Sequence, residues 1–120
     1  MAESKLKAQS MDFAVMIIEL VKQLKAQKES IISNQIGRSG TSIGANICEA
    51  QYAHSKADFI AKLQISLKEA NETGYWIVLL NRTGYIDGVQ YKKSNTACTS
   101  LRMMLIASIR TAKGHSTGED

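Results

Sequence analysis

Apolar residues recur along most of the chain at the three- and four-residue spacing of an α-helix, and short polar stretches interrupt this pattern at three places. At about 100° per residue, each of the four long segments gathers its apolar side chains on a limited arc. Long helices joined by short connections are typical of antiparallel neighbours in a bundle. The pattern predicts an all-α protein, an antiparallel up-and-down four-helix bundle, with helices at about Lys5–Lys28, Ile31–Tyr52, Ser55–Thr83 and Asp87–Gly114.

The first predicted helix has an unusually wide apolar side. Ala14, Ile18 and Val21 form a second flank beside the main stripe, and so wide a side must be buried against two neighbours. The main stripe, which we predict to be core, contains Leu6, Phe13, Ile17, Leu20 and Leu24.

The third predicted helix carries apolar residues on two opposite sides. Its inner face runs from Phe59 to Ile77, while Ile65, Trp76 and Leu79 lie on the other side. Apolar groups on both sides of one helix indicate a subunit contact as well as an intramolecular core. We therefore predict an oligomer contact at Ile65, Trp76 and Leu79.

Polar residues mark where the last two helices begin. Ser55 is placed to cap the third helix, with Asp58 in its first turn. Asp87 is placed to cap the fourth helix, and we expect the Gln90 side chain to reach back to it. The final residues, HSTGED at 115–120, are predicted to form a polar disordered tail, which leaves 1–114 as one bundle domain.

Three glycines lie within eight residues of the second segment, in the stretch QIGRSGTSIGANICEA at 35–50. As a loop, IGRSGTSI matches the GxxG layout with which KH domains clamp nucleic acid. A KH domain needs strands on either side, however, and both flanking segments here have helical periodicity. A P-loop would need a Lys-Ser/Thr pair after a strand, and the stretch has neither.

As a helix, the same stretch places Gly37, Gly40 and Gly44 on one side that has almost no side chains. Each glycine inside a helix costs about 1 kcal/mol relative to alanine. Close approach of another helix backbone offsets this cost through dispersion contacts. We therefore predict a continuous helix whose glycine side is packed tightly against a neighbour.

A polar stripe lies beside the apolar side of this helix, within an arc of roughly 80°. One interpretation is a solvated face, and the other is a hydrogen-bonded network at a helix or subunit interface. We favour the network, because the other two sides of the helix are apolar or bare and an unpaired buried member would cost about 1–3 kcal/mol. The predicted network consists of Gln35, Arg38, Ser42, Asn46 and Glu49.

Composition limits the kind of protein further. The chain has 120 residues, of which 44% are hydrophobic, so it has the size of one domain. Cys48 and Cys98 are fifty residues apart, and neither His54 nor His115 lies at metal-ligand spacing from them, so we expect two buried structural thiols and no metal or cofactor. The sequence shows no secretory signal or long apolar run, which favours a cytoplasmic protein without a membrane partner.

No residues with the spacing of a catalytic centre stand out. Glu49 lacks a His, Cys or Ser placed to work with it, and we find no combination of nucleophile, base and oxyanion donors. We therefore expect no enzymatic activity and no small-molecule substrate.

The formal net charge of +4 is a mild basic excess that becomes pronounced in the fourth helix. Between Gly88 and Gly118 there are five basic residues and no acidic one. Four of them fall within an arc of roughly 80°, an arrangement that neutralises phosphates with little sequence preference. The alternatives are an ordinary solvated face, or pairing with Glu69, Glu72 or a neighbouring subunit. The candidate nucleic-acid-binding residues are Lys92, Arg102, Arg110 and Lys113, extended by Arg82 and by Tyr85, which could stack on an unpaired base.

The sequence from 35 to about 86 resembles the 23S rRNA intervening-sequence proteins, also called four helix bundle proteins. The resemblance rests on QIGRSGTSIGANICEA and on SKADFIAKLQISLKEANETGYWIVLLNRTGYI. Matching positions are Gln35, Ile36, Arg38, Ser42, Ile43, Asn46, Ile47, Glu49, Phe59, Leu63, Ser66, Leu67 and Glu69.

This resemblance implies an antiparallel four-helix bundle that assembles into a ring-like homopentamer and is not an enzyme. Members of the family are encoded within intervening sequences of 23S rRNA genes or elsewhere in bacterial genomes, and nucleic-acid binding is the role usually suspected. The rival hypothesis is a protein-protein interaction scaffold with no nucleic-acid role, which would bind its partner through the apolar residues of the third helix.

Overall fold

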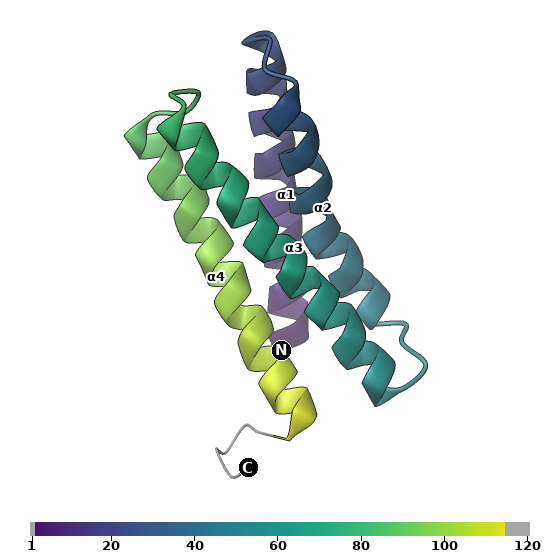
Figure 1. Ribbon diagram of the computed structural model, residues 1–120. Coiled ribbons are helices and arrows are strands. Elements are labelled where there is room, and N and C mark those ends of the chain that lie inside the picture. Colours follow the sequence, from purple (N-terminus) through teal and green to yellow (C-terminus); the bar gives the residue numbers. More distant parts are fainter. Residues whose placement is uncertain (1, 115–120) are drawn as a thin grey trace.

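The computed structural model of the protein describes residues 2–114, with side chains from Lys5 onward. The described part of the chain forms four α-helices, namely α1 (Ala2–Ala26), α2 (Ile31–Ala50), α3 (Lys56–Arg82) and α4 (Gly88–Lys113). Figure 1 shows them as four long rods that run side by side. The predicted all-α four-helix bundle is confirmed, and the predicted tail at 115–120 lies outside the described residues.

The helices are packed unevenly around the bundle. The α1–α2, α2–α3 and α3–α4 pairs make extensive contacts, whereas α1 and α4 touch along a shorter seam. In Figure 1 the α1–α2 pair and the α3–α4 pair diverge towards the end where α1 meets α2. Side chains from α1 and α4 line a groove of about 530 Å³, which contains Met16, Glu19, Leu20, Lys22, Gln23, Gln90, Lys93 and Ser94.

The helix ends follow the capping residues only in part. The Ser55 hydroxyl accepts from the backbone N–H of Asp58 at 3.0 Å, and the Asp87 carboxylate accepts from the N–H of Gln90 at 2.8 Å, so both predicted caps are confirmed. The Gln90 side chain does not reach back, and that prediction is wrong. It instead exchanges two amide hydrogen bonds with Gln23 of α1, at 2.8 and 3.1 Å, because α1 lies beside this flank and offers both a donor and an acceptor.

The start of α2 depends on a residue that the sequence analysis did not single out. The Glu29 carboxylate accepts from the backbone N–H groups of Ile32 at 2.9 Å and Ser33 at 2.7 Å. Glu29 is buried, whereas Ser30 caps nothing with its side chain. A carboxylate on the unpaired N–H groups of a first turn also has a favourable interaction with the helix dipole.

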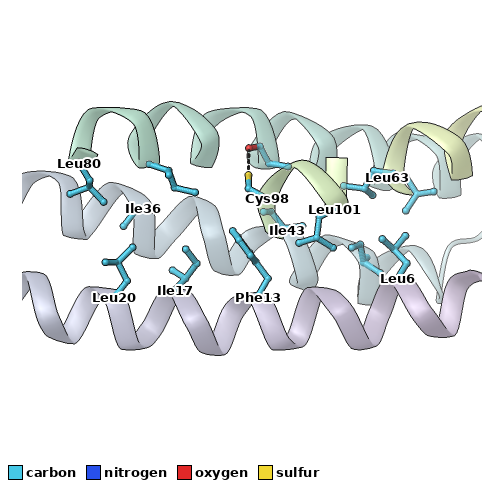
Figure 2. Close-up of a cluster of buried hydrophobic side chains, with 14 of the residues drawn as sticks. Leu6, Phe13, Ile17, Leu20, Ile36, Ile43, Leu63, Leu80, Cys98 and Leu101 are labelled. Atoms are coloured by element: carbon cyan, nitrogen blue, oxygen red, sulfur yellow. Dashed lines mark hydrogen bonds between the residues drawn. The ribbon is translucent and has the colours of Figure 1, made fainter. Parts of the chain in front are cut away.

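The core lies along the inner faces of all four helices (Figure 2). The main stripe predicted for α1 is fully buried. The second flank is not, because Ile18 remains 43% exposed while Val21 is half-buried. The reason is that α2 presents glycines on this side, so no side chain extends around α1 to cover Ile18.

The glycine side of α2 is pressed against α1, as predicted. A Cβ atom added at Gly40 would lie 2.8 Å from Ile17 Cγ1, which is closer than real Cβ contacts. At Gly37 and Gly44 the nearest atoms would be Val21 Cγ2 at 3.3 Å and Ser10 Oγ at 3.2 Å. The stretch is a continuous helix between helical neighbours, which excludes the KH interpretation.

Candidate nucleic-acid interface

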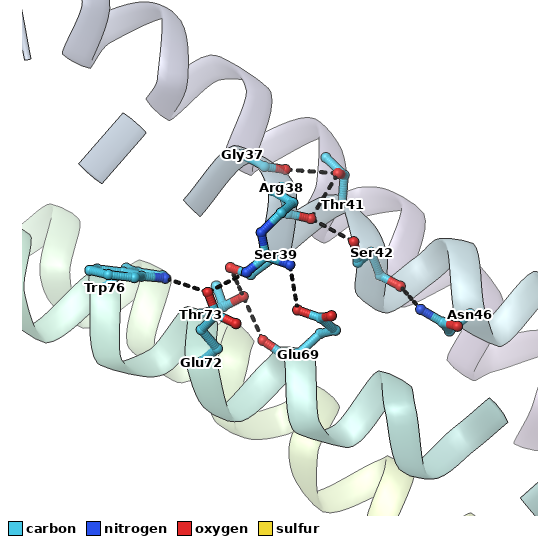
Figure 3. Close-up of polar contacts among 10 residues, drawn as sticks. All are labelled: Gly37, Arg38, Ser39, Thr41, Ser42, Asn46, Glu69, Glu72, Thr73 and Trp76. Atoms are coloured by element: carbon cyan, nitrogen blue, oxygen red, sulfur yellow. Dashed lines mark hydrogen bonds and ion pairs between the residues drawn. The ribbon is translucent and has the colours of Figure 1, made fainter. Parts of the chain in front are cut away.

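The two carboxylates in the middle of α3 are occupied by α2. Arg38 extends from α2 and forms ion pairs with Glu69, at 3.2 Å from Nη1 to Oε1, and with Glu72 through Nη2 (Figure 3). Trp76 Nε1 donates to the same Glu72 carboxylate at 3.0 Å. The hydrogen bonds from Arg38 and then Trp76 lower the pKa of Glu72, which therefore stays ionised. Neither carboxylate is left over to neutralise basic residues of α4.

The polar stripe predicted on α2 is not one connected network within the subunit. Ser42 donates to the backbone carbonyl of Arg38 at 2.7 Å, and Asn46 donates to the backbone carbonyl of Ser42 at 2.9 Å. Both side chains therefore form their hydrogen bonds within α2. Gln35 and Glu49 are exposed, and their side chains make no hydrogen bond to any described residue. Arg38 is joined to α3 rather than to Glu49. A role for this stripe between subunits stays a prediction.

Sequence analysis missed the hydrogen bonds that are buried between α2 and α3. Ser39 and Thr73 share a bond of 2.8 Å between their hydroxyls, and Ser66 donates to the carbonyl of Ile43 at 2.8 Å. All three hydroxyl residues are fully buried. Helical periodicity places each of these residues next to the core stripe of its own helix, so their burial could have been predicted. Periodicity does not show which residue of the neighbouring helix lies opposite, so their hydrogen-bond partners could not.

The candidate basic residues of α4 have no carboxylate partner in the described part of the chain. Lys92, Arg110 and Lys113 are exposed, Arg102 is half-buried, and Arg82 is exposed at the end of α3. The ion pairs between described residues are Lys22–Glu19, Arg38–Glu69 and Arg38–Glu72, so none involves these five. The alternative in which Glu69 or Glu72 pairs with α4 is therefore wrong within the subunit, because Arg38 holds both.

The aromatic residues close to α4 are turned towards the core. Tyr85 and Tyr91 are half-buried and pack against the hydrophobic cluster. Stacking of Tyr85 on a base stays a prediction, and the position of its ring favours a packing role instead.

The predicted oligomer contact on α3 is split between exposed and covered positions. Ile65 is 42% exposed, whereas Trp76 and Leu79 are half-buried against the core. Tyr75 lies edge-on to Trp76 with ring centroids 5.0 Å apart. A separate apolar stripe, which sequence analysis did not single out as a contact, lies on α1 at Met11, Val15 and Ile18, all exposed.

Two further observations concern other kinds of site. Among the described residues, no group of three His, Cys, Asp or Glu side chains is arranged to hold a metal ion. None of the four helices combines the length and apolar character needed to cross a bilayer.

Comparison with known proteins places the chain in a family. A family model described as 23S rRNA-intervening sequence protein matches residues 2–107. The chain belongs to this family. A crystal structure of a protein of unknown function from the S23 ribosomal protein family of Bacteroides thetaiotaomicron has the same fold, with a TM-score of 0.90 and 53% sequence identity. The match covers 92% of the present chain and 99% of that protein. No curated protein matches the chain.

Within this 23S rRNA-intervening sequence protein, the family match includes the glycine side of α2 and the Arg38 ion pairs. It ends at 107, so Arg110 and Lys113 lie beyond the matched residues. The resemblance seen in the sequence is confirmed, but the matched neighbour is itself of unknown function. The comparisons therefore show the family and the fold but no biochemical activity.

Proposed function

We propose that the protein is a non-enzymatic, cytoplasmic nucleic-acid-binding protein that works as a homo-oligomeric ring, of five subunits as the family resemblance implies. The observation that carries the proposal is the basic side of α4. This side presents Lys92, Arg102, Arg110 and Lys113, none of which has a carboxylate partner among the described residues.

The folded part of the chain is more basic than the whole sequence. Between Lys5 and Gly114 there are fifteen basic residues and eight acidic ones. Six of those acidic residues are engaged, either at helix starts or in ion pairs. The two others, Asp12 and Glu49, lie on α1 and α2. Positive charge is therefore concentrated where no acidic group opposes it, which suits a polyanion.

Assembly through α1 would keep this basic side accessible. Gln9 and Gln23 face α4, where they form hydrogen bonds with Ser100 and Gln90. At 100° per residue, the exposed apolar stripe of α1 lies roughly 130° around the helix from these two residues. An apolar contact there leaves α4 uncovered, and each copy in a ring then contributes one basic helix. Several linked basic helices raise avidity without requiring any new contact.

The test combines a mass measurement with a gel shift. Light scattering gives the number of subunits, and mobility shifts with structured RNA and with duplex DNA at two salt concentrations measure binding. We expect binding that weakens steeply with salt and is abolished by Arg102→Glu with Arg110→Glu. Lys7→Glu with Lys25→Glu makes the same charge change on α1 and should retain most of the binding. Unchanged binding by the α4 variant would reject the proposal.

A scaffold that binds another protein is the second candidate. It is favoured by Ile65 and Tyr75, which remain exposed on α3. If the protein is such a scaffold, Trp76→Ala should abolish partner binding, because Trp76 lies beside the exposed Tyr75. Circular dichroism should show that this variant is still folded. The α4 charge reversal would leave partner binding intact.

A further inference from the structure

Arg102 carries an unusual buried donor. Its Nε is the buried side-chain nitrogen or oxygen that lacks a hydrogen-bond partner in the part of the chain that the structure describes. Its guanidinium forms no ion pair with a described carboxylate either. Buried polar groups are nearly always paired, so this exception requires an explanation.

Arg102 lies beside the seam between α3 and α4. Arg102 follows Cys98 by one helical turn, and Cys98 Sγ donates to the carbonyl of Ala70 on α3 at 3.3 Å (Figure 2). The guanidinium is close enough to Cys98 for its charge to oppose the rise in the thiol pKa that burial causes. The acidic residues nearest the middle of α3, Glu69 and Glu72, are directed to Arg38 on α2. The fold thus positions a guanidinium without giving it a counter-ion.

The remaining basic residues extend this charge along a straight line. Lys92 and Lys113 lie at opposite ends of α4, roughly 32 Å apart at 1.5 Å per residue. Proteins that bind single strands stack bases on aromatic side chains. Tyr91, the aromatic residue within α4, packs against the core, as does Tyr85 in the preceding turn, whereas the exposed Tyr75 belongs to α3. A rigid basic helix that carries no exposed aromatic ring of its own suits a rigid row of phosphates.

We propose that α4 binds the phosphate backbone of a nucleic-acid duplex, without base stacking, and that Arg102 is the anchoring guanidinium. The inference rests on the proposed function and narrows it to double-stranded ligands. A phosphate supplies the anionic partner that the described part of the chain does not give to Arg102. Because the Nε itself is buried and Arg102 as a whole is only half-buried, the phosphate would bind the terminal nitrogens of the guanidinium.

The decisive variant is Arg102→Met, which keeps an unbranched side chain and removes the unpaired donor. Fluorescence anisotropy measures binding to duplex RNA, duplex DNA and the corresponding single strands at two salt concentrations, and urea unfolding measures stability. We expect duplex binding to weaken about tenfold, while the unfolding midpoint is unchanged or higher. The slope of log affinity against log salt should fall by about one. Lys7→Met, at an exposed position on α1, is the matched control and should change affinity far less.

The outcomes separate the inference from the function on which it rests. Loss of stability in Arg102→Met with unchanged duplex affinity would show that Arg102 is structural and would overturn the anchor. Equal affinity of the unaltered protein for single strands and duplexes would overturn the duplex assignment alone. Absence of binding to every probe at low salt would overturn the proposed function itself. If Arg102→Met does not fold, Arg110→Met at an exposed site of the same helix tests whether the basic side of α4 binds the duplex. Unchanged duplex affinity of Arg110→Met would reject duplex binding by this side of α4.

Discussion

Replacing Gly40 by alanine tests the closest contact in the molecule. The new Cβ would lie 2.8 and 2.9 Å from the two γ-carbons of Ile17 and 3.3 Å from its Cβ. Ile17 is β-branched, so rotation about its Cα–Cβ bond still leaves one γ-carbon on the side of Gly40, and the Cβ contact at 3.3 Å stays in every rotamer. The overlap is therefore relieved only if α1 moves away from α2. Overpacking costs about 1–3 kcal/mol, and two contacts below 3.0 Å place this site in the upper part of that range, at about 2–3 kcal/mol. The gain in helix propensity is about 1 kcal/mol. We expect a net loss of about 1–2 kcal/mol in the free energy of unfolding.

Urea unfolding followed by circular dichroism measures this loss. With a slope of about 2 kcal/mol per molar urea, the midpoint should fall by roughly 0.5–1 M. Gly74→Ala is the matched control, because its Cβ would meet Cys98 Sγ at an ordinary 3.9 Å. There the propensity gain is unopposed, and stability should rise by up to about 1 kcal/mol.

A double-mutant cycle with Ile17→Ala separates steric overlap from other causes. Removing the three carbons beyond Cβ costs about 2–5 kcal/mol in the unaltered protein because it leaves a cavity. In the Gly40→Ala background the loss should be at least about 1 kcal/mol smaller, since the new methyl group fills part of the space. A Gly40→Ala protein as stable as the unaltered one, with additive effects in the cycle, would refute the close approach of α1 and α2.

Three further predictions concern single side chains. Glu29→Ala removes the carboxylate that caps α2 and should lower the free energy of unfolding by about 1–2 kcal/mol in urea titrations, whereas Ser30→Ala should change it little. Because its pKa is lowered in the folded state, the ionised Glu72 stabilises the fold at neutral pH through its pairing with Arg38. This contribution is lost as the pH falls through the lowered pKa. The difference in the free energy of unfolding between the unaltered protein and Glu72→Gln should therefore shrink below about pH 4.3, the ordinary pKa of glutamate. Of the two thiols predicted to be buried, Cys98 is buried, but Cys48 is half-exposed, so that prediction is wrong for Cys48. Burial raises the pKa of Cys98 to about 11, so alkylation at neutral pH followed by mass spectrometry should modify Cys48 first and Cys98 only on unfolding.

Features that depend on one helix at a time could be predicted from the sequence. The buried stripe of α1 and the bare side of α2 follow from helical geometry, and the free-energy cost of glycine identifies Gly37 and Gly40 as contact positions. The caps at Ser55 and Asp87 follow from bonds within four residues.

Features that depend on which helices meet, and at what height, could not be predicted in the same way. Arg38 binds α3 because the register of α2 against α3 brings Glu69 and Glu72 within reach, and the sequence separation of more than thirty residues conceals this. Gln90 turns to Gln23 for the same reason. The lack of carboxylate partners for the α4 cations among the described residues is likewise a property of the assembled bundle, in which Arg38 of α2 pairs with both carboxylates in the middle of α3.

The seam between the first and last helices determines how the bundle can open. Among the helix pairs in contact, α1 and α4 share the shortest seam, and its side-chain hydrogen bonds are those of Gln23 with Gln90 and of Gln9 with Ser100. Sub-global fluctuations should therefore begin there while α2 and α3 stay folded. The two helices released by such a fluctuation are the one with the exposed apolar residues and the one with the basic residues. A partner that holds either helix would therefore change how often the other one opens. Under the proposed function, assembly and ligand binding would then be coupled, and hydrogen exchange of the α1 and α4 amides would measure this coupling.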